Sequence, residues 1–189
     1  NQSFESIREK NNFYIDKTSF IKEWWENDDT VTLITRPRRF GKTLNLNMLE
    51  CFFSNKYKDR GDLFEGLDIW KEEKYRELQG TYPVIFISFA KIKQNNYTDT
   101  IAGIKRIICD VIQKYYFLKD WQGLTDEEKN NLKSITYGMD DVTAQEAIAS
   151  ISNYLSRYYG KKVIILLDEY DTPMQEAYVN GYWEELVAF

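Results

Sequence analysis

The chain has 189 residues, of which 43% are hydrophobic, and it carries a net charge of −5 with no histidine. This size and apolar content predict one packed domain, or one and part of a second, and exclude a disordered chain. The lack of histidine excludes Ser-His-Asp and Cys-His catalysis and most zinc hydrolases. The net negative charge argues against bulk affinity for nucleic acid, although a local basic patch remains compatible with it.

The first 30 residues predict two helices. Residues 4–10 form a short helical candidate, and four apolar or aromatic residues then recur at helical spacing, Phe20, Ile21, Trp24 and Trp25. The sequence contains no apolar run long enough to span a membrane, and its polar start lacks a signal-peptide core. We therefore expect a cytoplasmic protein with no membrane partner. Because the sequence does not begin with methionine, we also expect a trimmed or partial chain.

An apolar segment, a basic loop and a helix start come next. Residues 31–35 predict a buried strand, and residues 41–43, Gly-Lys-Thr, open a helix. This order is typical of a loop that holds nucleotide phosphates, because backbone N–H groups and a helix N-terminus then face the anion. The general pattern has a glycine, four residues and then Gly-Lys-Ser/Thr, and here Arg36 replaces the first glycine. Pro37 stiffens the loop and lacks an N–H donor.

The remaining sequence alternates helices with apolar strands. The expected elements are, in order, a helix over residues 42–53, short helices over 54–82, a strand over 83–89, a helix over 98–117, helices opened by capping boxes at 125–128 and 143–146, a strand over 163–167 and a helix that starts at Thr172-Pro173. The near-continuous apolar strands indicate coverage on both faces, as in a parallel sheet. The order predicts an α/β fold in one domain. Cys51 and Cys109 lie in apolar helical patterns and predict buried, reduced thiols.

Charged residues follow two of the expected strands, at the ends where α/β folds bind ligands. Lys42 follows the first strand and would neutralise the outer phosphates of a nucleotide. Thr43 and Asp168 supply the oxygen ligands that Mg²⁺ prefers. Glu169 would orient or deprotonate the attacking water, since a chain without histidine must use a carboxylate or the substrate itself for that task.

Each of these signals has a plainer interpretation. Gly-Lys-Thr often occurs by chance, and Asp-Glu at a strand end can be a solvated turn and helix cap; their combination in this order favours a nucleotide site. Arg36, Arg38 and Arg39 either border the phosphates or form an anion or nucleic-acid patch. Asp171 is expected to cap the following helix. Two aromatic residues upstream of the loop either lie near the adenine or pack in the core, namely Phe13 and Tyr14.

Four stretches carry a resemblance to a known family. They are Tyr-Ile-Asp-Lys-Thr at 14–18, Thr-Arg-Pro-Arg-Arg-Phe-Gly-Lys-Thr-Leu at 35–44, Leu-Phe-Glu-Gly-Leu at 63–67 and Leu-Asp-Glu-Tyr-Asp-Thr-Pro at 167–173. With these motifs, essentially the whole chain resembles a family of predicted bacterial AAA-type ATPases that are often fused to a C-terminal restriction-endonuclease-like nuclease domain. The family's own form of the loop carries arginine at the position of Arg36.

The resemblance implies a three-layer P-loop NTPase fold of the additional-strand type, with a parallel sheet. The additional strand would follow the Asp-Glu strand, and the sequence offers no candidate for it before Phe189. Residues 1–189 are therefore expected to be the N-terminal part of one P-loop ATPase domain, incomplete at its C-terminus. A phosphate-loop strand without its neighbour would favour strand exchange or a homo-oligomer.

We therefore predict a module that binds ATP and hydrolyses it with Mg²⁺, as a regulatory switch or motor for a nuclease or other effector. Nucleic acid would be reached through a nuclease domain outside this chain. Lys42 and Glu169 would be catalytic, Thr43 and Asp168 would hold the metal, and the nucleotide would contact Arg36, Pro37, Arg38, Arg39, Phe40, Gly41, Lys42, Thr43 and Leu44. The alternative is a P-loop-shaped scaffold that binds nucleic acid or protein without hydrolysis.

Overall fold

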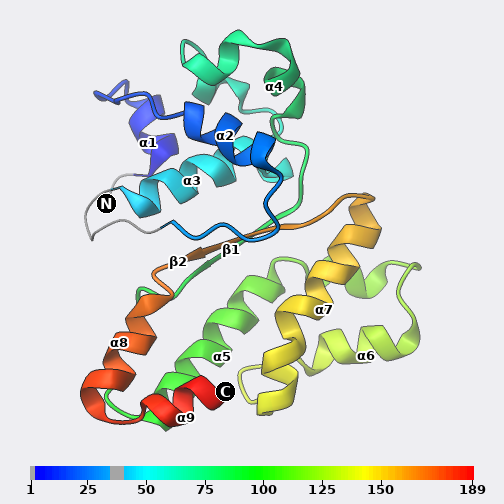
Figure 1. Ribbon diagram of the computed structural model, residues 1–189. Coiled ribbons are helices and arrows are strands. Elements are labelled where there is room, and N and C mark those ends of the chain that lie inside the picture. Colours follow the sequence, from blue (N-terminus) through cyan, green and yellow to red (C-terminus); the bar gives the residue numbers. More distant parts are fainter. Residues whose placement is uncertain (1–2, 35–40) are drawn as a thin grey trace. The chain divides into compact units, whose positions relative to one another are not determined.

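The computed structural model describes residues 3–34 and 41–189, and the chain divides into two compact units (Figure 1). The N-terminal unit comprises residues 1–84 and the C-terminal unit residues 85–189. Both units are mainly helical, and in the described part of the chain the sheet consists of two parallel strands. The α/β class is confirmed. The three-layer, additional-strand arrangement and the single ATPase domain stay predictions.

The N-terminal unit is built from helices around a group of aromatic side chains. The rings of Phe4 and Phe64 stack with centroids 5.2 Å apart, and Phe52 meets Phe64 edge to face at 5.2 Å. Such pairs add to the stabilisation that burial already gives. The elements are α1 (Phe4–Glu9), α2 (Ser19–Asn27), α3 (Lys42–Phe53), the short 3₁₀ helices η1 (Asn55–Tyr57), η2 (Gly61–Phe64) and η3 (Asp68–Lys71), and α4 (Glu73–Leu78).

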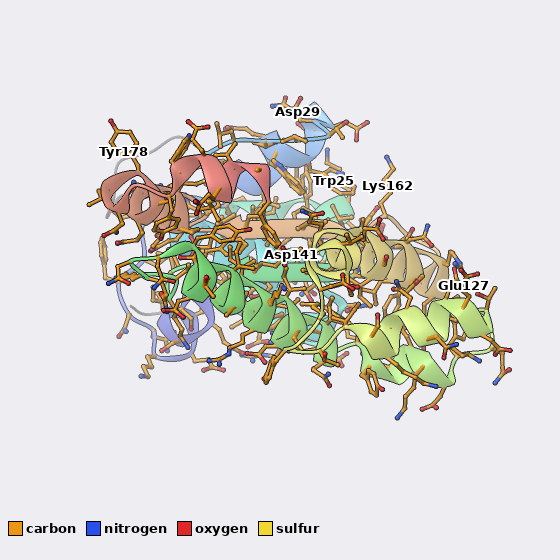
Figure 2. All side chains as sticks on the ribbon, turned by 90° about the horizontal axis from the view of Figure 1, so that it is seen from below. Trp25, Asp29, Glu127, Asp141, Lys162 and Tyr178 are labelled. Carbon is orange, nitrogen blue, oxygen red and sulfur yellow. The ribbon has the colours of Figure 1, made fainter. Side chains whose placement is uncertain are left out.

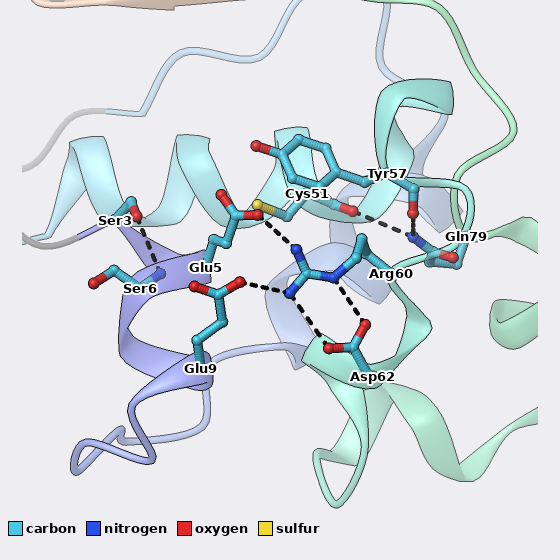
Figure 3. Close-up of polar contacts among 9 residues, drawn as sticks. All are labelled: Ser3, Glu5, Ser6, Glu9, Cys51, Tyr57, Arg60, Asp62 and Gln79. Atoms are coloured by element: carbon cyan, nitrogen blue, oxygen red, sulfur yellow. Dashed lines mark hydrogen bonds and ion pairs between the residues drawn. The ribbon is translucent and has the colours of Figure 1, made fainter.

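Arg60 ties α1 to the segment that contains η2 (Figure 3). Its guanidinium lies 2.7 Å from Glu5 and 2.9 Å from Glu9 of α1, and its Nε donates to Asp62 at 3.0 Å. The planar guanidinium suits several carboxylates at once because its donors point in fixed directions. Figure 3 also shows the Gln79 amide, which donates to the carbonyl of Tyr57 at 2.7 Å. These contacts hold short segments that have little regular structure of their own.

Asp16 of the Tyr-Ile-Asp-Lys-Thr motif has a structural role in this unit. Its carboxylate accepts hydrogen bonds from the backbone N–H of Thr18 at 2.8 Å and of Asp68 at 2.7 Å. Burial acts in the opposite direction, but these hydrogen bonds hold the pKa of Asp16 below its usual value. The fully buried Thr18 hydroxyl in turn accepts from the N–H of Ile69 at 3.1 Å. The motif therefore fastens the start of α2 to η3.

The strand predicted over residues 31–35 is wrong for its described part, residues 31–34, which have no regular structure. Val31 is 86% exposed and Leu33 is 62% exposed. The Trp24 indole donates to the Thr32 hydroxyl at 3.1 Å and holds this segment beside α2. An apolar run becomes a strand only when a neighbouring strand supplies hydrogen-bond partners. Among the described residues, the sheet contains only β1 (Val84–Ser88) and β2 (Ile164–Asp168).

The C-terminal unit packs long amphipathic helices against β1. Figure 1 shows α5 (Tyr97–Gln113) and α7 (Asp141–Tyr159) side by side, and both contribute to one apolar core with Ile85 and Ile87 of β1. Along β2, Leu166 and Asp168 are buried whereas Ile165 and Leu167 are nearly half exposed. The remaining elements are η4 (Tyr116–Asp120), α6 (Asp126–Ser134), α8 (Asp171–Asn180) and α9 (Trp183–Ala188).

Some of the helix ends in this unit have the caps that the sequence predicts, and one does not. The capping box of Thr125 and Glu128 is confirmed at the start of α6, and Gly160 ends α7 in the left-handed region as expected. The box predicted at residues 143–146 is wrong. The carboxylate of Asp140 instead accepts from the N–H of Thr143 at 2.7 Å, so that α7 begins earlier. Asp140 is the N-cap in place of Thr143, because an aspartate side chain readily accepts from the N–H groups of the first helical turn.

Glu128 makes stability in this unit depend on pH. The Arg157 guanidinium and the Thr125 N–H lower the pKa of Glu128 from 4.5 to about 2. A lowered folded-state pKa stabilises the fold above the unfolded value, and that stabilisation is lost as the pH falls from about 4.5 to about 2. We expect Glu128→Gln to be less stable than the parent chain at neutral pH and to lose less stability across this window.

Denaturant unfolding followed by circular dichroism at a series of pH values measures this difference. Glu127→Gln, which removes an exposed carboxylate from the same turn, is the matched control. An equal loss of stability in the parent chain and in Glu128→Gln would contradict the assignment.

Both cysteines are free and buried, as the sequence predicts. Burial raises the pKa of the Cys51 thiol to about 12, which keeps it protonated and unreactive. None of the described helices has both the length and the apolar composition needed to cross a bilayer.

Candidate functional site

The residues predicted to bind a nucleotide lie at two places in the chain. Lys42, Thr43 and Leu44 are in the first turn of α3, in the N-terminal unit. Asp168 and Glu169 are at the carboxyl end of β2, in the C-terminal unit. Each place is built by local chemistry within its own unit.

Helix α3 begins where the Gly-Lys-Thr sequence predicts. Gly41 is the N-cap residue and has a φ of 78°, in the left-handed region that glycine enters without strain. Its carbonyl accepts the first helical hydrogen bond from the N–H of Asn45 at 2.9 Å. Gly41 has no side chain that could cap the N–H groups of the first turn of α3, and these N–H groups form the positive end of the helix dipole.

The body of α3 anchors that helix start. Asn45, Leu46, Met48 and Leu49 are buried, whereas Lys42, Thr43 and Leu44 are half-buried. The carboxamide of Asn47 accepts a hydrogen bond from the N–H of Phe4 at 2.6 Å and so joins α1 to α3. These contacts fix the second and third turns of α3, and the first turn is held through them.

The predicted contacts of the loop itself, Arg36, Pro37, Arg38, Arg39 and Phe40, lie outside the described residues. Their roles stay predictions. Of the two aromatic candidates near the adenine, Tyr14 packs in the core: its ring meets Phe4 at 5.4 Å and its hydroxyl contacts the Met48 sulfur at 3.2 Å. Phe13 is 89% exposed.

The carboxylate of Asp168 is buried at the end of β2. Asp168 is 4% exposed, and its carbonyl accepts a hydrogen bond from the N–H of Phe89, directly after β1. A buried carboxylate needs compensation by hydrogen bonds, a cation or a metal ion. This hydrogen bond fixes the backbone of Asp168, directly before Glu169.

Glu169 has an unusual backbone conformation. Its φ is 50°. The other described residues that have a positive φ and are not glycine are Asn11 and Asp28. Asparagine and aspartate adopt this region because their short side chains bond locally, whereas glutamate does so at a cost of about 1–2 kcal/mol. Strained residues of this kind concentrate at functional sites. The strain singles out the residue that the sequence predicts as the general base.

Thr172 contacts the predicted general base, and the sequence analysis missed this contact. Its hydroxyl donates to the Glu169 carboxylate at 3.3 Å, and its N–H donates to the Glu169 carbonyl at 3.0 Å. Thr172 is 4% exposed and belongs to the first turn of α8. The order Glu-x-x-Thr is the reverse of a capping box, so no pattern in the sequence indicated this contact.

The expected cap at Asp171 is wrong. Asp171 is the first residue of α8, and its carboxylate accepts from the Gln175 amide at 3.2 Å. Pro173 is the third helical residue rather than the first. The turn at Glu169 is tight, so the helix starts before the proline, and the missing N–H of Pro173 is still one that the first turn would leave free.

Both of the predicted metal ligands carry oxygen donors. Thr43 offers a hydroxyl oxygen and Asp168 a carboxylate, which are oxygen ligands of the kind that Mg²⁺ takes. Within residues 3–34 and 41–189, no group of three or more His, Cys, Asp and Glu side chains is placed to hold a metal ion.

A helix that starts at Gly-Lys-Thr and a strand that ends in Asp-Glu are features of α/β proteins that bind nucleotides. The chain belongs to the family described as "Predicted AAA-ATPase", whose model matches residues 1–189. Membership of this family indicates a nucleotide-binding or ATPase function.

The chain is also 30% identical over 178 residues to "Uncharacterized protein in vnfD 5'region" of Azotobacter chroococcum mcd 1. The match covers 92% of this chain and 28% of the relative's length. No solved structure matches the chain.

Proposed function

We propose that this chain binds ATP together with Mg²⁺ and hydrolyses it. The observation that carries the proposal is the start of α3, where Gly41 at positive φ opens an anchored helix with Lys42 and Thr43 in its first turn. Family membership adds to this support, since the family is one of predicted ATPases.

The proposed division of work follows from the chemistry of each group. Lys42 and the first N–H groups of α3 bind the outer phosphates, and residues 36–44 surround them. Thr43 and Asp168 hold Mg²⁺, which when bound neutralises phosphate charge and orients the triphosphate. Glu169 accepts a proton from the attacking water or orients it. Thr172 positions the Glu169 carboxylate through its hydroxyl.

The chain spans 28% of the length of the curated relative that it matches, so the activity of the whole protein is also a proposal. We place this module in the cytoplasm, as a switch or motor that controls a nuclease or another effector domain. In the intact protein it would act as the N-terminal part of an ATPase domain, and as a homo-oligomer if a second copy completes its sheet.

Calorimetric titration with ATP and Mg²⁺ tests binding, and release of inorganic phosphate tests hydrolysis. Saturable binding and steady release are the expected results. A folded chain that shows neither contradicts the proposal. A flat phosphate signal combined with DNA binding that falls on Arg38→Ala would instead support a non-hydrolysing scaffold.

Thr172→Val is expected to lower the turnover number by about 3- to 10-fold and leave the affinity for ATP unchanged. The change removes one hydrogen bond to Glu169 but keeps the shape of the buried side chain, and such a bond is worth about 0.5–1.5 kcal/mol. Steady-state phosphate release separates kcat from KM. Thr172→Ser, which retains the hydroxyl, is the matched control and should keep more of the activity than Thr172→Val. Equal turnover numbers for Thr172→Val and the parent chain would remove Thr172 from its positioning role.

A further inference from the structure

Helices α8 and α9 present a continuous apolar face to solvent, which we call the α8–α9 face. On α8, Val179 is 79% exposed and Tyr178 is 77% exposed, and Figure 2 shows the Tyr178 side chain projecting away from the ribbon. Large apolar side chains rarely gather on a surface without a binding role. The exposed side chains that form the face are Met174, Tyr178 and Val179 of α8, Tyr170 directly before it, and Trp183 and Val187 of α9.

The opposite side of the same two helices is already packed. Ala177, Tyr182 and Leu186 form a small core with Ile101 of α5. The Tyr182 hydroxyl lies 3.0 Å from the Thr100 hydroxyl and also donates to the Gln94 carbonyl at 2.8 Å. These contacts hold α8 and α9 in place, so that the exposed side chains form a fixed surface.

The α8–α9 face is hollowed, not flat. A cavity of about 440 Å³ lies among Met174, Tyr178, Val179 and Trp183, with Asp171 and Gln175 at its border. The rings of Tyr178 and Trp183 meet edge to face with centroids 6.4 Å apart and form one wall. A groove with one aromatic wall is suited to the apolar side chains of a helix, which enter at positions i, i+3 or i+4 and i+7.

The segment that forms the groove carries acidic residues and no basic ones, and Asp171 lies at the groove itself. Residues 163–189 contain six acidic side chains and no lysine or arginine. Four of the acidic residues belong to α8 and α9, namely Asp171, Glu176, Glu184 and Glu185. A second copy of this face would bring like charges together, and nucleic acid or an anionic membrane would be repelled. A positively charged protein segment meets no such penalty.

From the apolar groove and its acidic border, we propose that the α8–α9 face binds a basic amphipathic helix of a partner protein. Apolar residues on one side of that helix fill the groove between Tyr178 and Trp183, and its lysines or arginines pair with the acidic border. This interaction goes beyond nucleotide binding and does not depend on it. The face lies on α8, which begins two residues after Glu169.

Fluorescence anisotropy of a labelled synthetic peptide tests the proposal. The probe is a helix of about 15 lysine and leucine residues, enough for four turns, with leucine at i, i+3, i+4 and i+7. We expect it to bind the chain, and we expect the double variant Tyr178→Ser with Val179→Ser to weaken binding by about tenfold or more, as for a central contact. Both side chains are highly exposed, so the variant should fold normally.

Four controls separate the contribution of shape from that of charge. Phe117→Ser with Val142→Ser removes exposed apolar side chains elsewhere in the C-terminal unit and should leave binding unchanged. A peptide of the same composition with scrambled leucines, and one with glutamate in place of lysine, should each bind at least about tenfold more weakly. Glu184→Gln with Glu185→Gln should weaken binding and reduce its salt dependence.

Several results would overturn the proposal. They are no binding of the patterned peptide, equal binding of the scrambled peptide, and unchanged binding by the double variant. A dimer seen by light scattering that Tyr178→Ser with Val179→Ser dissolves would assign the face to a second copy instead.

Discussion

Replacing Lys42 with alanine is expected to lower the affinity of the chain for ATP by about 10- to 100-fold. The ammonium group at the start of α3 would donate charge-assisted hydrogen bonds to the outer phosphates, and such bonds are worth about 1.5–3 kcal/mol. Each 1.4 kcal/mol corresponds to about a factor of ten in the dissociation constant. Helix α3 itself should persist, because alanine is the strongest helix former.

Calorimetric titration with ATP and Mg²⁺ measures this loss, and circular dichroism shows that the variant is folded. Lys58→Ala removes an exposed lysine from the same unit and should bind like the parent chain. The comparison matters because the net charge of both variants changes equally, so a general electrostatic effect would weaken both. Equal affinity of Lys42→Ala and the parent chain would exclude the start of α3 as the phosphate site.

The start of α3 could be predicted because its chemistry is local. Gly41 marks the N-cap, and the apolar residues that follow at helical spacing predict the helix itself. The expected strand over residues 31–35 depended instead on a partner elsewhere in the chain. Apolar sequence alone does not distinguish a paired strand from an exposed segment such as the one that contains Val31 and Leu33.

The same contrast between local and distant contacts explains which site residues could be predicted. Asp168 could be predicted because an apolar strand leads directly into it. Thr172 was missed because its role depends on the left-handed turn at Glu169, and nothing in a glutamate predicts that conformation. The Asp16 motif supported the family resemblance, but its carboxylate bonds the N–H groups of Thr18 and Asp68. A recurrent motif can thus record a packing requirement as readily as a catalytic one.

Glu169→Gln is expected to retain ATP binding and lower turnover by about 10²- to 10⁴-fold, the usual contribution of a general base. The amide has the same size as the carboxylate and can still accept the hydrogen bond from Thr172, but it cannot take a proton. Phosphate release measures turnover, and calorimetry on the same sample measures binding. Glu146→Gln on α7 is the control for removing an exposed carboxylate.

Glu169→Gly separates catalysis from folding at the same position. Glycine adopts a φ of 50° without strain, so this variant should be more stable than the parent chain by about 1 kcal/mol, although the lost contact with Thr172 offsets part of the gain. It should also lack turnover. A residue retained only for structure would show the reverse, a loss of stability with activity intact. A more stable and inactive variant would mean that the strain at Glu169 is maintained for the reaction and not for the fold.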